Sequence, residues 1–107
     1  MEIIAMGELR AFLKDQLPNW KDPVIFISSD FIPGCPKCNS NATVYYIKLT
    51  ERISIPNEQN VIKAEKHKFP IDIYVKYPFM KGIPQKIVIG TRDSRGGLEM
   101  ILRRVVD

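Results

Sequence analysis

The sequence predicts an α/β protein, because helical and strand patterns are mixed along a chain of 107 residues. From Met6 to Leu17, apolar residues recur at the spacing of a helix with one buried stripe. The run PVIFISS, which begins at Pro23, is apolar and β-branched and has the length of a buried strand. The run KIVI, from Lys86 to Ile89, predicts a second strand.

Two further segments carry helical patterns. The segment Asn41 to Ile53, NATVYYIKLTERI, fits both a helical stripe and the alternation of a strand, and its β-forming residues favour a strand. The last eleven residues, GLEMILRRVVD, start with the second glycine of a pair and place four apolar residues on one helical face. These four residues are Leu98, Ile101, Leu102 and Val105.

Length and composition indicate one domain, residues 1–107, with 45% hydrophobic and 26% charged residues, as in an ordinary globular protein. The N-terminal segment is acidic at Glu2 and carries further charges, so it lacks the pattern of a signal peptide. No stretch approaches the length of a membrane span. We therefore expect a cytoplasmic protein without membrane contact, in which thiols are more often metal-binding or catalytic than structural.

The chain has two cysteines, in the motif Cys35-Pro36-Lys37-Cys38. A disulfide across so short a loop stabilises a protein by at most ~2 kcal/mol, which excludes the disulfide framework of a small secreted protein. Three interpretations remain: a redox couple, half of a zinc site, or two small buried residues. The motif alone does not separate them.

The motif combines with a second one. Gly82-Ile83-Pro84 directly precedes the KIVI strand, and Pro84 lies 46 residues beyond Cys38. A strand followed by Cys-x-x-Cys, and a later Gly-Ile-Pro before another strand, resemble the thioredoxin-like superfamily, which includes thioredoxins and glutaredoxins. The strand, turn, paired glycines and amphipathic segment at the end of the chain are similar to the end of glutaredoxins.

This resemblance implies a three-layer α/β/α core over residues 23–107, with a mixed central sheet of about four strands. Residues 1–20 would be a helical extension, and residues 39–53 would form the helix that starts at the cysteines. Such a helix would activate a thiolate through its dipole and unpaired amide groups.

The resemblance also implies the activity, a thiol–disulfide oxidoreductase. Cys35 would be the nucleophile and Cys38 the resolving thiol. Ile83 would offer backbone hydrogen bonds to the substrate, and Pro84 would follow a cis peptide bond. No cofactor beyond the redox-active disulfide is implied. The substrate would be a disulfide-containing protein or a glutathione-like thiol, and the protein would be a monomer or a weak homodimer.

Zinc is the alternative cofactor. Cys35 and Cys38 also match a zinc knuckle, a tight turn followed by a strand. Structural zinc takes four ligands, whereas the chain has two cysteines and one histidine, His67, 29 residues beyond Cys38. A site shared by two chains would supply four thiolates. We expect His67 itself to be a solvated surface residue.

The net charge of +4 suggests an alternative function, a non-catalytic basic binding protein with a zinc knuckle or a redox-responsive cysteine pair. Its partner would be a nucleic acid or a protein. Four arginines gather near the C-terminus, and a solvated face of the last helix is favoured over nucleic-acid contact as their explanation. These residues are Arg92, Arg95, Arg103 and Arg104.

Overall fold

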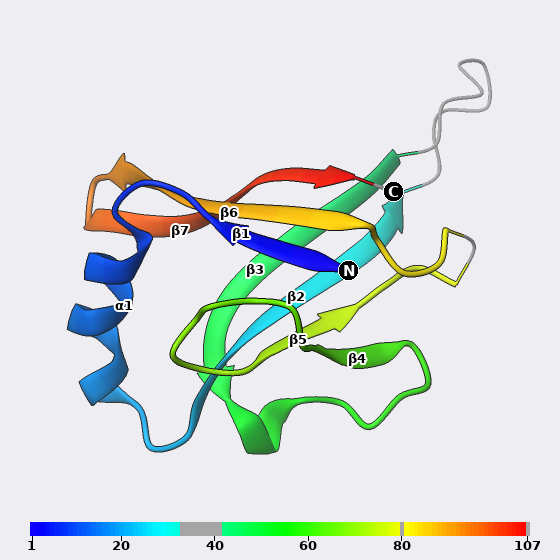
Figure 1. The fold of residues 1–107 in the computed structure, drawn as a ribbon, viewed down its shortest axis with the longest axis horizontal. Helices are drawn as coiled ribbons and strands as arrows, with labels where there is room; N and C mark the ends of the chain where they lie inside the picture. Colours follow the sequence, from blue (N-terminus) through cyan, green and yellow to red (C-terminus); the bar gives the residue numbers. More distant parts are fainter. Residues whose placement is uncertain (33–41, 80, 107) are drawn as a thin grey trace.

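In the computed structural model of the protein, which describes residues 1–32, 42–79 and 81–106, strands form two sheets (Figure 1). Sheet A has the order β1-β6-β7, from the strands Glu2–Ala5, Lys86–Ser94 and Gly97–Val106. Sheet B has the order β3-β2-β5-β4, from the strands Ala42–Glu51, Pro23–Ile32, Ile73–Lys76 and Val61–Ala64. Helix α1 is Leu9–Gln16, and the short 3₁₀ turns η1 and η2 are Leu17–Asn19 and Arg52–Ser54.

Both sheets are mixed. β1 runs parallel to β6, and β6 and β7 form an antiparallel hairpin. In sheet B, β2 pairs with β3 in antiparallel and with β5 in parallel orientation, while β4 and β5 are antiparallel. An isolated bridge between Glu2 and Lys66 joins β1 to the segment that follows β4, and the Ile3 N–H donates to the carbonyl oxygen of Lys66 at 3.3 Å. Strands of both sheets contribute side chains to one buried core.

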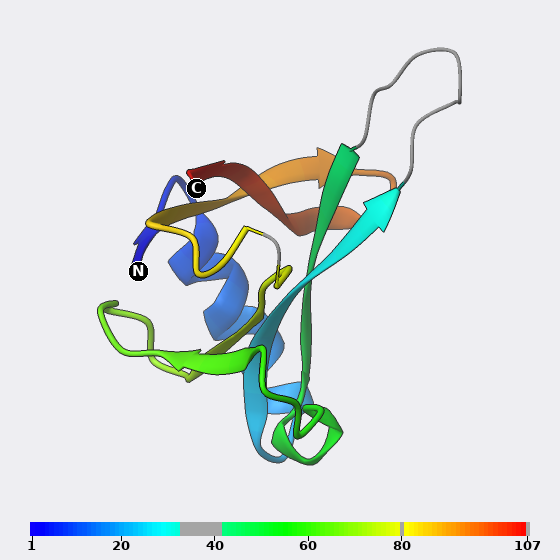
Figure 2. The same cartoon turned by 90° about the vertical axis from the view of Figure 1, so that its right-hand side faces the viewer.

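Side chains from both sheets and from α1 fill that core. Leu9 and Leu13 of α1 are fully buried, and the helix lies between the sheets at one end of the molecule (Figures 1 and 2). The alternation of β2 turns Ile25 and Ile27 inward. The buried core cluster consists of Ile3, Leu9, Leu13, Ile25, Ile27, Ala64, Ile73, Val75, Ile87 and Ile89.

The predicted thioredoxin-like α/β/α architecture is wrong. It needs helices on both faces of one central sheet, whereas the described residues contain one α-helix and two sheets that face each other. The helix that the resemblance treats as an extension contributes Leu9 and Leu13 to the core. The first helix and the strands at Pro23 and Lys86 are confirmed as α1, β2 and β6, with α1 beginning at Leu9 rather than at Met6.

The predicted helix over residues 39–53 is also wrong, because Ala42–Glu51 is strand β3. Ile47 and Leu49 pack against the core opposite Ile27 and Ile25 of β2, so the two-residue alternation is the pattern that the fold uses. Residues 43–47 are β-branched or aromatic, and these residue types suit the pleated surface of a sheet.

The predicted C-terminal helix is strand β7. Its glycine pair closes the β6–β7 hairpin, where Gly97 takes a φ of 111° that other residues rarely adopt. Leu102 and Val105 both pack against the core, although strand alternation would turn residues three apart to opposite faces. A β-bulge explains this, because Leu102 pairs with Ile89 and Arg104 with Val88, which leaves Arg103 as the extra residue.

Candidate nucleic-acid interface

The residues that the resemblance predicts as a site are only partly described. Cys35 and Cys38 lie outside the described residues. Ile83 is half exposed and Pro84 is fully buried, in the loop before β6. Because no peptide bond in the described part of the chain is cis, the bond before Pro84 is trans, and the predicted cis-proline is wrong.

The connection that contains the cysteines differs from the expected strand-to-helix turn. It joins β2 to β3, whose ends pair in antiparallel register at Ile32 and Ala42. The helix on which the predicted activation of a thiolate depends is therefore missing from residues 42–51. The geometry of the described residues gives thiol exchange no support.

The structure instead gathers cationic side chains on the outer face of sheet A. Ile87 and Ile89 of β6 face the core, so alternation turns Lys86, Val88 and Arg92 to the opposite face. Arg104 of β7 pairs with Val88 and shares that face. We call Lys86, Arg92, Arg103 and Arg104 the basic face.

Arg103 joins the basic face because of the bulge. Its side chain lies over Gly90, where a Cβ atom built on the glycine would be 3.0 Å from both Cγ and Nε of Arg103. One terminal nitrogen of its guanidinium, Nη2, donates to the carbonyl oxygen of Thr91 at 2.7 Å. The glycine thus leaves room for an arginine that is held flat against the sheet.

The cations of the basic face differ in their partners. Arg92 forms an ion pair with Glu99 on the neighbouring strand. Lys86, Arg103 and Arg104 form no ion pair with any carboxylate of the described residues. Arg103 and Arg104 are exposed, and their charges are available to an anion from solvent.

Apolar side chains lie between the cations. Ile4 of β1 and Ile101 and Val106 of β7 are partly buried on this face, and Val88 is buried beneath its neighbours. The described residues of the face include no aromatic side chain. The face therefore offers charge and aliphatic contact but no ring on which a base stacks.

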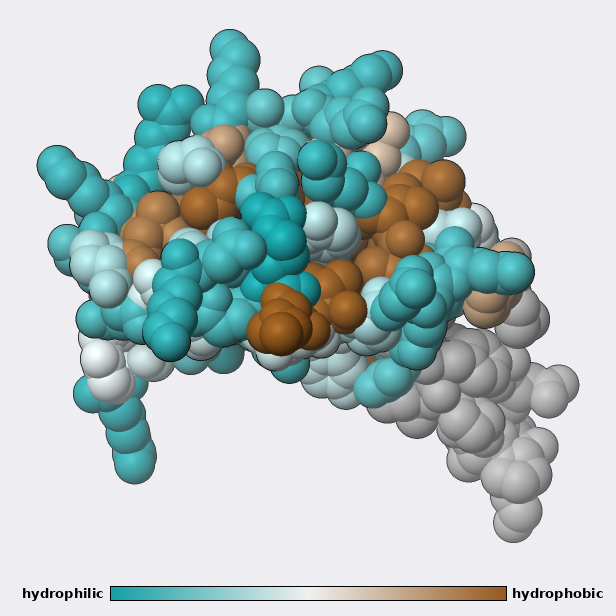
Figure 3. Space-filling model, turned by 90° about the horizontal axis from the view of Figure 1, so that it is seen from below, coloured by the Kyte–Doolittle hydropathy of each residue, from teal (hydrophilic) through white to brown (hydrophobic). Residues whose placement is uncertain are grey.

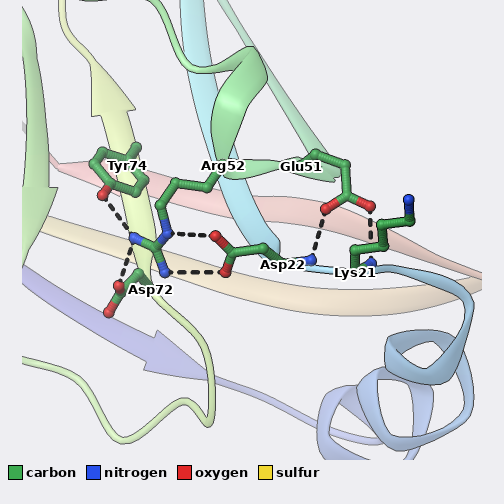
Figure 4. A network of polar contacts seen from close by, with 6 residues as sticks. All are labelled: Lys21, Asp22, Glu51, Arg52, Asp72 and Tyr74. Atoms are coloured by element: carbon green, nitrogen blue, oxygen red, sulfur yellow. Dashed lines mark hydrogen bonds and ion pairs between the residues drawn. The ribbon is translucent and has the colours of Figure 1, made fainter.

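A second charged cluster is structural. Arg52 lies between two carboxylates, with Nε 3.0 Å from Asp22 and Nη1 2.8 Å from Asp72, and it donates to the Tyr74 hydroxyl at 2.8 Å (Figure 4). The Glu51 carboxylate accepts the backbone N–H groups of Lys21 and Asp22 at 2.9 and 2.7 Å. These contacts fasten the end of β3 to β2 and β5.

The electrostatics of this cluster follow from its hydrogen bonds. Those to Asp22, and then to Asp72, raise the pKa of the Arg52 guanidinium. The hydrogen bond from Arg52 holds the pKa of the Asp72 carboxyl below its usual range. The two carboxylates and the guanidinium of this cluster thus satisfy one another, which is why we assign the cluster a structural role.

The side of the molecule that η2 occupies also carries exposed apolar surface, at Ile53. Figure 3 shows apolar side chains there among hydrophilic ones. Ile53 is 94% exposed, but single exposed apolar residues are ordinary on protein surfaces. No group of three His, Cys, Asp or Glu side chains that could hold a metal ion is found in residues 1–32, 42–79 and 81–106, and no helix there is long and apolar enough to cross a membrane.

Sequence reasoning found the arginines of the basic face but missed Lys86. It also assigned Arg103 and Arg104 to a helix. The strand pattern of KIVI contained the missing signal, because Lys86 and Val88 are two residues apart and therefore share a face. The bulge at Arg103 has no comparable signal in the sequence.

The described residues thus define the class, a mixed β protein in which one α-helix and a basic sheet surface accompany two sheets. Comparison with protein-family models, with curated proteins and with solved structures gives no match.

Proposed function

We propose that the protein binds nucleic acid through the phosphate backbone, with the basic face of sheet A as the interface. The observation that carries the proposal is the register of β6 and β7, which gathers Lys86, Arg92, Arg103 and Arg104 on one sheet surface. This is the function of a basic binding protein rather than of an oxidoreductase.

The charge balance of this surface supports the proposal. Its four cations share the outer face with two carboxylates, Glu2 and Glu99. The surplus of two positive charges is half of the net charge of the whole chain, +4. Concentrated positive charge attracts a polyanion over long range, and neutralised phosphates release their counterions.

The arginines supply the hydrogen bonds. A guanidinium presents donors in a planar fork that matches two phosphate oxygens. The position of Arg103 over Gly90 and its bond to Thr91 hold that side chain before any ligand arrives, so less side-chain entropy is lost on binding. Arg104 and Lys86 are exposed or partly exposed and adjust to the spacing of phosphates.

The side chains between the cations set the specificity. Phosphate contacts position a protein on nucleic acid but do not read its sequence. Because no aromatic ring is found among the described residues of this face, it has no stacking platform for bases. We therefore expect binding that varies little with base sequence. We also propose a cytoplasmic location, the compartment expected in the sequence analysis.

Fluorescence anisotropy with a labelled DNA duplex tests the proposal. Arg104→Gln removes one exposed cation of the basic face, and Lys48→Gln, on the exposed face of sheet B, is the matched control. We expect Arg104→Gln to weaken binding to duplexes of different sequence by the same factor, and Lys48→Gln to leave it unchanged. Equal effects of the two variants would reject the basic face as the interface.

A further inference from the structure

A cavity of about 640 Å³ opens at the edge of β1, beside the basic face. Its walls are β1, Arg10 of α1 and the segment Glu65–Pro70. Its volume lies within the range of small-molecule sites in proteins, about 300–1,000 Å³. Part of the lining is apolar, from Ile3, Ile4 and Phe69. The cavity is therefore large enough for a molecule with one ring and a polar group.

Three cations line the cavity: Arg10, Lys66 and Lys68. All three are exposed, and none forms an ion pair with a carboxylate in the part of the chain that the structure describes. Elsewhere Arg52, Lys76 and Arg92 do form such pairs. The positive charge of these three side chains is thus not offset by a direct ion pair within the described residues.

Two carboxylates, Glu2 and Glu65, also line the cavity. Glu2 lies directly opposite Lys86 in the parallel pair of β1 and β6, without an ion pair between them. The cavity lining therefore has three cations against two carboxylates, a surplus of one positive charge. The balance favours an anionic ligand.

His67 adds an oriented donor to the cavity. Its Nδ1 accepts the backbone N–H of Phe69 at 3.1 Å, and its ring meets the Phe69 ring edge-on at 5.6 Å. Because Nδ1 is an acceptor, the proton of the neutral ring is on Nε2, which acts as a donor. Half-buried His67 is thus held in place by contacts within its own turn, rather than being the solvated residue that the sequence predicts.

The backbone of β1 supplies another donor. The N–H groups of Glu2 and Met6 bond to carbonyl oxygens at either end of the parallel pair with β6, at 2.9 and 2.8 Å. N–H groups of alternate residues in a strand point in opposite directions, so those of Ile3 and Ala5 point away from β6. Ile3 bonds to Lys66, while Ala5 lines the cavity and meets no acceptor within the described residues.

From this arrangement we propose that the cavity at the β1 edge binds a small anionic molecule with a ring-sized apolar body, a carboxylate or a phosphate ester. The anionic group contacts Arg10, Lys66 or Lys68 and the N–H donors of Ala5 and His67. The apolar body packs against Ile4 and Phe69. This site adjoins the outer face of sheet A at Glu2 and Ile4, and its proposal does not depend on nucleic-acid binding.

Two-dimensional ¹H–¹⁵N NMR with three probes tests the proposal: benzoate, phenyl phosphate and benzylamine. The probes share a ring and differ in the charged group. We expect benzoate or phenyl phosphate to shift the amide signals of Ala5 and residues 66–69 in a saturable manner, with the two anions separating carboxylate from phosphate recognition. Benzylamine should leave these signals in place.

Charge variants complete the test. Arg10→Gln and Lys68→Gln should each weaken binding of the preferred anion by about two- to fivefold, the effect of one exposed ion pair. Lys14→Gln changes an exposed cation of the same helix outside the cavity and should have no effect. The proposal is overturned if neither anion shifts the cavity amides, if benzylamine binds as tightly, or if Lys14→Gln weakens binding as much as Arg10→Gln.

Discussion

The side chain of Arg103 lies across Gly90 on the outer face of sheet A, at the point where β7 carries one residue more than β6. Gly90 is buried beneath it, and Arg103 bonds onward to the carbonyl oxygen of Thr91. This pair of residues connects the fold with the proposed function. The bulge that allows both Leu102 and Val105 to contact the core also places Arg103 on the basic face.

Substitution of Gly90 tests this relationship. In Gly90→Ala, the added methyl group would be 3.0 Å from the side chain of Arg103. This flexible side chain can move away by the few tenths of an ångström that the contact requires. We expect the free energy of unfolding to change by less than about 1 kcal/mol in urea titrations, since alanine also costs less backbone entropy than glycine. A decrease in the free energy of unfolding well above about 2 kcal/mol would show that the side chain of Arg103 cannot move aside.

Leu13→Ala tests whether α1 belongs to the core. Leu13 is fully buried between the sheets, so its truncation should cost about 2–5 kcal/mol of stability. Ile53→Ala, at a side chain that is 94% exposed, is the control and should change stability by less than about 0.5 kcal/mol. Equal effects of the two substitutions would show that α1 is a peripheral extension and not part of the core.

Asp72 makes stability depend on pH in the acid range. Its pKa in the folded protein lies below the unfolded value of about 3.9, because Arg52 donates to its carboxylate. The stabilisation is therefore complete well above pH 4 and is lost as the pH falls through the folded pKa. Asp72→Asn should be less stable than the wild type at neutral pH, and the difference should shrink on acidification. A constant difference in urea titrations between pH 6 and pH 2 would contradict this assignment.

The role of Cys35 and Cys38 stays a prediction that solution chemistry decides. Because β3 is a strand, we expect zinc to protect both thiols from alkylation, with two chains supplying four thiolates. Mass spectrometry after alkylation in glutathione buffers measures this. If both thiols are instead oxidised together, at a midpoint potential between about −270 and −180 mV and without protection by zinc, the result would support a thiol–disulfide oxidoreductase.

Much of the fold could be predicted where one pattern dominates a segment. β2 and β6 are apolar and β-branched, and their strands follow from that alone. β3 fits two periods, and its residue propensities favoured the correct one. The resemblance to thioredoxins selected the other period, because it required a helix after the cysteines.

β7 could not be predicted from periodicity. The extra residue at Arg103 places Leu102 and Val105 three apart on the core side, which is the spacing of a helix. A bulge is a property of the pairing with β6, and the β7 sequence alone does not contain it. The basic face shares this limit, since the bulge and the register together put Arg103 and Arg104 on the same face of the sheet as Lys86.

The cavity was hidden for a different reason. Arg10 and Lys68 are far apart in the sequence, and they line the same cavity only because a bridge at Lys66 brings that segment against β1. The charged neighbours of His67 in the sequence predict a solvated residue. The bond from Phe69 to its ring depends on a local turn that periodicity does not report.

The salt dependence of duplex binding tests the central claim, that the basic face binds phosphates, most directly. The logarithm of the binding constant falls linearly with the logarithm of salt concentration, with a slope of about −0.9 for each phosphate neutralised. We predict that Arg104→Gln and Lys86→Gln each make the slope less steep by up to about 0.9, while Lys48→Gln leaves it unchanged. A wild-type slope near zero, or slopes that all three variants alter equally, would contradict the account.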